Sequence, residues 1–104
     1  MQKTGAGLLA PFIFIFPLVI QAAVTEREQA IALAMQTVAK IHPGEPLSVV
    51  KIRAVEWPDA SLGCPKPGML YAQVIVDGFH IVLAASNHLY TVHTGQGRAT
   101  ICRH

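Results

Sequence analysis

The first 23 residues are the feature that most limits what this chain can fold into. They hold a single charged residue, Lys3, followed by an apolar run over 7–20 and small residues at the exit. A basic start, an apolar stretch of this length and a small-residue end are typical of a secretory signal peptide. We predict a signal peptide over 1–22 and one exported domain over 24–104, periplasmic or secreted.

Two alternatives remain open at this end of the chain. Cleavage after Ala22 places Ile20 at the −3 position, which suits that subsite better than Gln21 does after cleavage at Ala23. A retained anchor would use the 18 residues of 7–24, close to the lower limit for crossing a bilayer. In either case the domain lies outside the cytoplasm, and it is attached to a membrane only if this segment is retained.

Charge and size narrow the classes of function. The chain has 104 residues, of which 13% are charged, with a formal net charge of +2 and no cluster of Lys or Arg. This is no electrostatic footprint for nucleic acid, so we expect no nucleic-acid partner. An exported domain of about 81 residues buries a small core, which makes a covalent cross-link valuable.

The two cysteines of the chain, Cys64 and Cys102, both lie in the predicted exported part. An even number of cysteines in an oxidising compartment predicts a disulfide. Closing a loop of about 38 residues would stabilise the fold by roughly 4 kcal/mol in the chain-entropy model. Because the chain has no C-x-x-C motif, we interpret this disulfide as structural.

The pattern along the domain predicts one helix followed by strands. Thr25 and Glu28 have the spacing of a capping box, and prolines stop the helical pattern, so we predict a helix over 26–41. The predicted fold is α+β, with this amino-terminal helix packed on a four- to five-stranded antiparallel sheet and one disulfide. Strands are predicted over 47–57, 69–76, 79–84, 89–94 and 99–103, with turns at Asp77-Gly78, Ser86-Asn87 and 95–97.

The predicted register places polar residues together on the sheet face away from the helix. His80 falls opposite His93, and two imidazoles are a partial set of zinc ligands. A zinc site needs three or four ligands, and the spacing offers no third one. A metal-binding domain that uses these histidines stays as an alternative, but we predict no metal ion and no other cofactor. The residues expected on this face are Tyr71, Gln73, His80, Thr91 and His93.

Residues 57–68 are the segment most dense in special residues, with three Pro, two Gly, one Cys and the single Trp of the chain. Prolines and a disulfide lower the entropy of a loop before a partner arrives, which favours binding. The structural alternative is a rigid crossover between strands, with Trp57 in the core. We predict that binding depends on Trp57, Asp59, Ser61, Lys66, Tyr71 and Gln73.

The same segment suggests two other functions. Lys66, flanked by prolines, could enter a protease pocket, so a protease inhibitor is an alternative. Pro67 opposes a substrate-like fit because a tertiary amide is a poor scissile bond.

Ser61, His93 and Asp59 are the residue types of a hydrolytic triad, but no G-x-S-x-G elbow is present. Asp59 is better suited to accepting hydrogen bonds within a turn. We therefore expect no enzymatic activity.

One longer motif, W-x-D-x-S-L-G-C-P-x-P-G-x-x-Y-x-Q, spans 57–73 and is followed by a hairpin and Tyr90-x-x-His93. With this motif the chain resembles a family of small exported bacterial proteins of unknown function, over about 50–102. The resemblance implies export and a domain-sized unit, and it assigns no catalytic residue. We expect a disulfide-bonded binding domain whose unknown partner is an envelope or extracellular protein or ligand.

Overall fold

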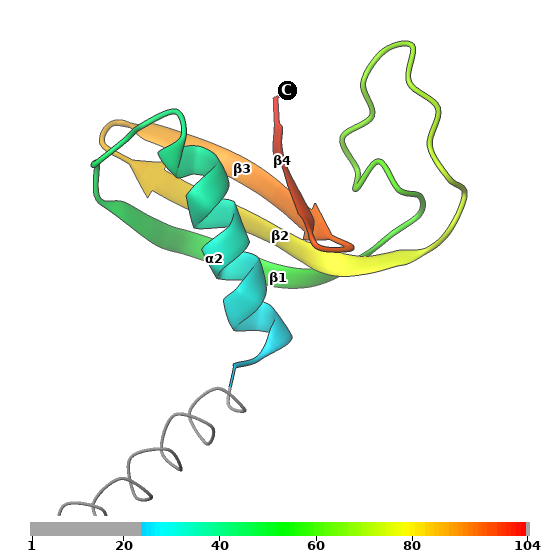
Figure 1. Ribbon diagram of the computed structural model, residues 1–104, viewed down its shortest axis with the longest axis horizontal. Coiled ribbons are helices and arrows are strands. Elements are labelled where there is room, and N and C mark those ends of the chain that lie inside the picture. The colour runs from blue at the N-terminus through cyan, green and yellow to red at the C-terminus, as the bar shows by residue number, and fades with distance from the viewer. Residues whose placement is uncertain (1–23, 104) are drawn as a thin grey trace, which may run out of the picture.

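The computed structural model describes residues 24–103, so the predicted signal peptide over 1–22 lies outside the described residues. Figure 1 shows a helix against a twisted sheet, with a long loop beyond one end of the sheet. Within the described part, no helix is long and apolar enough to cross a membrane. Its elements are α2 (Glu26–Ala39), β1 (Leu47–Trp57), β2 (Val76–Ala85), β3 (His88–Gly95) and β4 (Arg98–Cys102).

Helix α2 begins where the capping box predicts. The Thr25 hydroxyl accepts a hydrogen bond from Glu28 N at 3.1 Å, and the Glu28 carboxylate accepts one from Thr25 N at 3.1 Å. These reciprocal bonds satisfy N–H groups that have no partner inside the helix. The helix ends at Ala39, two residues before the predicted 41, because the following residues close a turn on Val38 O.

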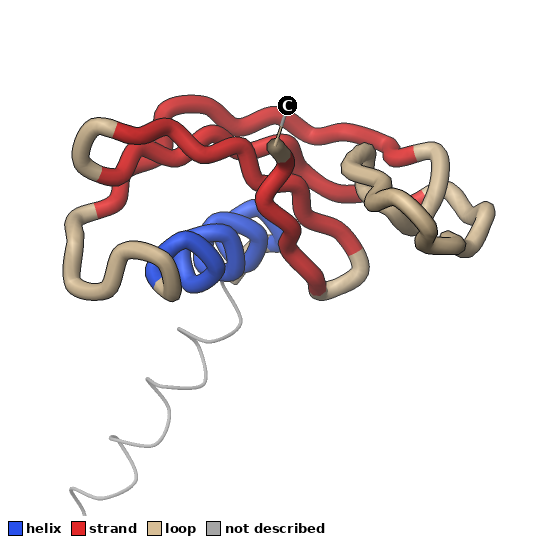
Figure 2. The backbone as a smooth tube through the Cα atoms, turned by 90° about the horizontal axis from the view of Figure 1, so that it is seen from above, coloured by secondary structure: helices blue, strands red, loops and turns tan. Residues whose placement is uncertain are grey.

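The four strands form one antiparallel sheet in the order β1-β2-β3-β4, and α2 covers one face of it (Figure 2). Since alternate residues of a strand point to opposite faces, every second residue of β2 and β3 lies under the helix. This confirms the predicted α+β fold. The core between helix and sheet consists of Ala30, Ala34, Val38, Ile81, Leu83, Ala85 and Val92.

The predicted hairpin between β2 and β3 is confirmed. Ile81 pairs with Val92 and Leu83 pairs with Tyr90, as a turn at Ser86 requires. Ser86 adopts a left-handed φ of 53°, which reverses the chain tightly. The last predicted turn also forms, and β4 begins and ends one residue earlier than expected.

The predicted turn at Asp77-Gly78 is wrong, because both residues lie inside β2 and pair with β1. The predicted strand over 69–76 is wrong as well, since residues 69–75 belong to a loop over 58–75 that connects β1 to β2. The first hairpin of the sheet is therefore formed by β1 and β2 around this long loop. The glycine in β2, Gly78, instead leaves space for the side chain of Trp57.

Strand β1 forms one edge of the sheet and is irregular. Its pairing with β2 shifts between Val49 and Lys51, so Val50 is an extra, bulged residue. Ile52 pairs with Ile81 of the core. The neighbours of Ile52 in the strand, Lys51 and Arg53, therefore lie on the sheet face away from α2.

Candidate functional site

A second, smaller core lies on the sheet face opposite α2, which we call the loop face. Trp57, Leu62 and Val76 are buried there, with Val55 packed against them. Leu62 belongs to the loop and is fully buried, so its side chain holds the loop against the sheet. Trp57 was predicted as a binding residue, and the structure places it in this core with 7% exposure.

The indole of Trp57 reaches from β1 across β2 to β3. Its Nε1–H donates a hydrogen bond to Thr94 O at 2.9 Å, and its ring stacks on the His93 ring with centroids 4.3 Å apart. A Cβ atom at Gly78 would lie 2.8 Å from Trp57 Nε1 and 1.7 Å from Thr94 O. A side chain there would block this contact, which explains a glycine inside a strand.

The loop turns at Leu62 and Gly63, whose φ angles are 58° and 74°. This left-handed conformation is unfavourable for leucine by about 1 kcal/mol, and burial of its side chain offsets that strain. At Gly63 a Cβ atom would lie 2.7 Å from the Trp57 ring. Gly63 is therefore required for both its backbone conformation and the space it leaves.

His93 connects the loop to the sheet and is 6% exposed. Its Nδ1 lies 2.7 Å from Leu62 O, and its Nε2 lies 3.0 Å from His80 Nδ1. A carbonyl oxygen can only accept, so His93 Nδ1 carries a proton, and the Nε2 of a neutral ring accepts the bond from His80. The predicted pairing of His80 with His93 is confirmed.

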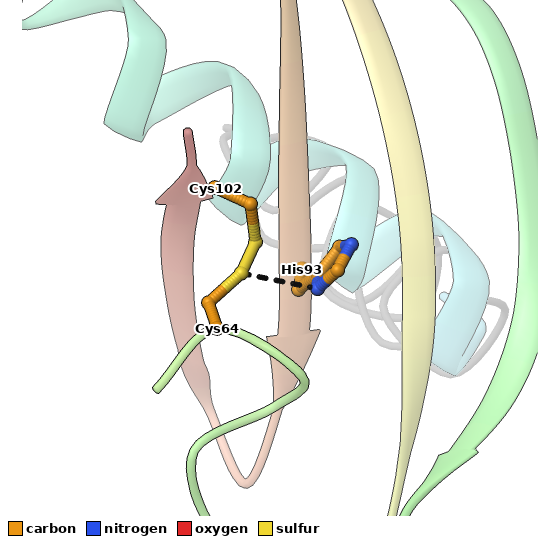
Figure 3. Close-up of side chains that lie close together, drawn as sticks. All are labelled: Cys64, His93 and Cys102. Atoms are coloured by element: carbon orange, nitrogen blue, oxygen red, sulfur yellow. Dashed lines mark hydrogen bonds between the residues drawn. A yellow bond between two sulfur atoms is a disulfide. The ribbon is translucent and has the colours of Figure 1, made fainter. Parts of the chain in front are cut away.

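The predicted disulfide joins Cys64 to Cys102 and fastens the loop to β4 (Figure 3). Cys64 Sγ also lies 3.3 Å from His93 Nδ1. The sulfurs and a His93 nitrogen lie within 4.8 Å of one another, a grouping that sequence spacing did not reveal. A metal ion requires deprotonated thiolates, so this trio has the donor set of a soft-metal site only in a reduced chain.

Asp59 and Ser61 shape the first turn of the loop. Asp59 Oδ1 accepts hydrogen bonds from Ser61 N, at 2.9 Å, and from the Ser61 hydroxyl. The hydroxyl bond is the larger of the two causes that lower the pKa of Asp59 below its ordinary value. The interpretation of Asp59 as a turn residue is confirmed, and both predicted binding residues have a structural function in the loop.

We call residues 65–75 the arm, which extends beyond the end of the sheet (Figure 1). Three predicted binding residues lie in it: Lys66 N donates to the Tyr71 hydroxyl at 3.0 Å, and the Gln73 amide donates to Tyr71 O at 3.3 Å. The predicted placement of Tyr71 and Gln73 on the sheet beside His80 is wrong, because this segment is not a strand. Two backbone bonds also brace the arm, from Ala60 N to Ala72 O and from Met69 N to Lys66 O.

The arm exposes four large apolar side chains within seven residues: Met69 (58% exposed), Leu70 (97%), Val74 (47%) and Ile75 (73%). Exposed apolar patches on a soluble domain mark interaction sites. The sequence prediction missed these residues because it placed 69–76 in a strand with a buried face. The sequence did contain a signal for an apolar surface in this segment, because the chain has no acidic residue between Asp59 and Asp77.

Charge is distributed unequally between the two faces of the sheet. The register places Lys51, Arg53 and Arg98 on the loop face, and the Arg98 guanidinium donates to Ala60 O at 2.8 Å. The two acidic residues of the sheet, Glu56 and Asp77, pair with each other on the helix face. The loop face is therefore the more positive side of the sheet.

His42 lies in the α2–β1 connection, which meets the β2–β3 turn at the other end of the sheet from the loop (Figure 1). His42 Nε2 lies 2.6 Å from the Tyr90 hydroxyl, and His42 Nδ1 pairs with the Glu45 carboxylate. The Ser86 hydroxyl also donates to Glu45, and this bond is the first cause that lowers the Glu45 pKa. These contacts join two connections of the fold.

Together, the fold and the site define a small disulfide-linked α+β domain with a braced loop that exposes an apolar arm. Residues 28–102 match the family model described as Domain of unknown function (DUF8738), and the chain belongs to this family. The match spans nearly all of α2, the sheet and the loop, in line with the expected membership of an uncharacterised family. No curated protein and no solved structure matches the chain.

Proposed function

We propose that this protein is an exported binding domain that recognises a protein partner through the loop 58–75. The observation that carries the proposal is the contrast between the two parts of the loop. Its base is fixed by Leu62, by the His93 hydrogen bond and by the disulfide, whereas its arm exposes four large apolar side chains. The disulfide is compatible with an oxidising compartment outside the cytoplasm.

A loop that is ordered before binding loses less entropy when a partner arrives. The arm is held to the base by the Ala60–Ala72 backbone bond and internally by the bond from Lys66 N to Tyr71. Prolines at 65 and 67 further restrict the backbone beside Lys66. The arm is therefore a preorganised projection, which favours a recognition element over a simple connection between strands.

The composition of the arm indicates the chemistry of the surface that the partner presents to it. Lys66 is the one charged residue among four exposed apolar side chains, and the loop face beside the arm carries further cations. A complementary surface is an apolar groove with acidic side chains at its rim. The rim contacts contribute mainly to the association rate, and the apolar contacts contribute most of the affinity.

The test is site-specific photo-crosslinking in the full-length chain, produced in its native cell. A photoreactive residue at position 74 should yield one dominant crosslinked protein, and Leu70→Asp in the same chain should reduce its capture at least about tenfold. Leu89→Asp is the matched control, because Leu89 is 68% exposed but lies on the β2–β3 hairpin. Both variants should keep the melting temperature of the wild type, since neither side chain is in a core.

Equal capture by Leu70→Asp and the wild type would refute the proposal, as would an equal loss in the Leu89→Asp control. Lys66→Ala adds a second readout: the association rate should fall and become less dependent on salt, with a smaller effect on the dissociation rate.

A further inference from the structure

The two cysteines of the disulfide differ in exposure to solvent. Cys64 is half-buried, whereas Cys102 is 7% exposed and belongs to the last strand. Both line an open groove of about 630 Å³ between the arm and β4. In thiol–disulfide exchange an incoming thiolate attacks one sulfur of the bond, and access decides which one. The geometry therefore favours attack at Cys64 over attack at Cys102.

The groove beside this bond is positively charged. Lys66 and Arg103 are among the residues that line it, and none of the lining residues within 24–103 is acidic. Cations near a cysteine favour its thiolate form, which is the reactive form in exchange. They also attract an incoming thiolate, which is an anion.

His93 places an N–H group beside the sulfur of the more exposed cysteine. Its Nδ1 carries a proton because it donates to Leu62 O, and the same nitrogen lies 3.3 Å from Cys64 Sγ. When Cys64 is released as a thiolate, this one proton can be shared between Leu62 O and the sulfur. The bond from His80 to Nε2 holds the ring in this orientation.

We infer that Cys64 and Cys102 form a thiol–disulfide exchange site, in which Cys64 is the attacked sulfur and Cys102 is the leaving one. This inference goes beyond the proposed binding function and does not depend on it. The earlier interpretation of the bond as purely structural relied on the missing C-x-x-C motif. The fold supplies by tertiary contact what that motif supplies by spacing, namely one partly exposed cysteine, one buried cysteine and a nearby group that stabilises the thiolate.

The chemistry balances with a thiol as the co-reactant. A thiolate attacks Cys64 Sγ and forms a mixed disulfide, while the Cys64–Cys102 bond breaks and its electron pair leaves on Cys102, which takes up a proton. A second thiolate then attacks the sulfur of the first thiol and displaces Cys64 as a thiolate beside His93. The protein gains two thiols, and the two thiol molecules are oxidised to one disulfide.

The experiment identifies which sulfur is attacked in the unmodified, full-length chain. The oxidised protein is incubated with glutathione at neutral pH, trapped with iodoacetamide and cleaved for peptide mass mapping. We expect glutathione on Cys64 and the carbamidomethyl group on Cys102. The fluorescence of Trp57, the single tryptophan, reports whether the fold persists during the reaction. Glutathione on Cys102, or no mixed disulfide until Trp57 reports unfolding, would overturn the inference.

Lone-cysteine variants give a second, quantitative test. Cys64 in Cys102→Ser should react with iodoacetamide about tenfold faster than Cys102 does in Cys64→Ser. Adding His93→Phe to Cys102→Ser keeps a ring against Trp57 but removes the N–H, and the rate at Cys64 should fall. His93→Gln keeps an N–H donor and should retain more of that rate. Equal rates for the two lone cysteines, both matching free glutathione, would contradict the inference.

Discussion

Trp57 and His93 stack with their ring centroids 4.3 Å apart and their planes 25° apart, although one residue lies on β1 and the other on β3. The indole crosses β2 above Gly78, and the histidine in turn bonds to the loop at Leu62 O. The contact therefore joins three strands and the base of the loop. The contribution of this contact to the stability of the protein can be tested by substitutions in the loop that disturb it.

Gly63→Ala should destabilise the protein more than Gly68→Ala does. Both glycines have a left-handed φ, so each substitution costs about 1 kcal/mol in backbone strain. At Gly63 the added Cβ also lies 2.7 Å from the Trp57 ring, whereas nothing lies within 4 Å at Gly68. This overpacking adds about 1–3 kcal/mol, measured as the free energy of unfolding in urea. Equal losses for the two variants would show that the loop base does not press on the indole.

Replacing both cysteines by serine should lower the melting temperature strongly. The disulfide closes a loop between residues 38 positions apart, and its loss removes up to about 4 kcal/mol in the chain-entropy model. Differential scanning calorimetry measures the shift. Reduction of the wild-type chain should lower the melting temperature by a similar amount, because both changes remove the same constraint. A double variant that melts like the oxidised wild type would contradict this prediction.

The stabilisation by the Asp59 carboxylate should depend on pH. Hydrogen bonds from the Ser61 hydroxyl and then from Ser61 N lower the pKa of Asp59 below its ordinary 3.8. A lowered pKa in the folded state means that the carboxylate stabilises the fold above pH 3.8, and that this stabilisation is lost as the pH falls through the lower, folded value. The stability difference between wild type and Asp59→Asn should therefore be largest at neutral pH and shrink in acid.

Ser61→Ala provides the control for that titration, because it removes the hydroxyl that contributes most to the shift. In the Ser61→Ala background, Asp59→Asn should change stability less at neutral pH than it does in the wild type. The measurement is urea unfolding at several pH values. A wild-type difference that stays constant into acid would exclude the bond to Ser61 as its cause.

Zinc should leave the melting temperature of the oxidised protein unchanged. His93 Nδ1 donates to Leu62 O and His93 Nε2 accepts from His80, so binding at either nitrogen would break a buried hydrogen bond. Both neighbouring sulfurs are held in the disulfide. A thermal-shift titration with zinc chloride checks this. A shift that appears in the oxidised wild type and disappears in His93→Ala would instead support the metal-binding alternative.

Local signals predicted much of this fold. The Thr25–Glu28 capping box set the start of the helix, and the turn at Ser86 set the register that brings His80 opposite His93. The disulfide followed from the even cysteine count. The helix start and the turn depend on residues that are close together in the sequence, and two cysteines can pair in only one way.

The errors arose where a distant contact decides the structure. Asp77-Gly78 has the form of a hairpin turn, but Gly78 is needed so that Trp57, 21 positions earlier, can cross β2. Apolar residues over 69–75 alternate like a strand, yet β1 occupies the edge of β2 with which they would pair. For this reason the exposed apolar residues of the arm were assigned to a predicted strand. The proximity of His93 to Cys64 also depends on the loop path, which sequence spacing does not show.

The bulge at Val50 has a consequence for the association of the domain with itself. A long, flat outer strand invites a second copy to extend the sheet, and natural proteins prevent this with bulges and lysines at the edge. Here the extra residue bends β1 beside Lys51 and Arg53, so two such edges would meet out of register and with like charges. Solutions of the domain should consequently resist fibre growth from this edge, although 11 of its residues form the strand there.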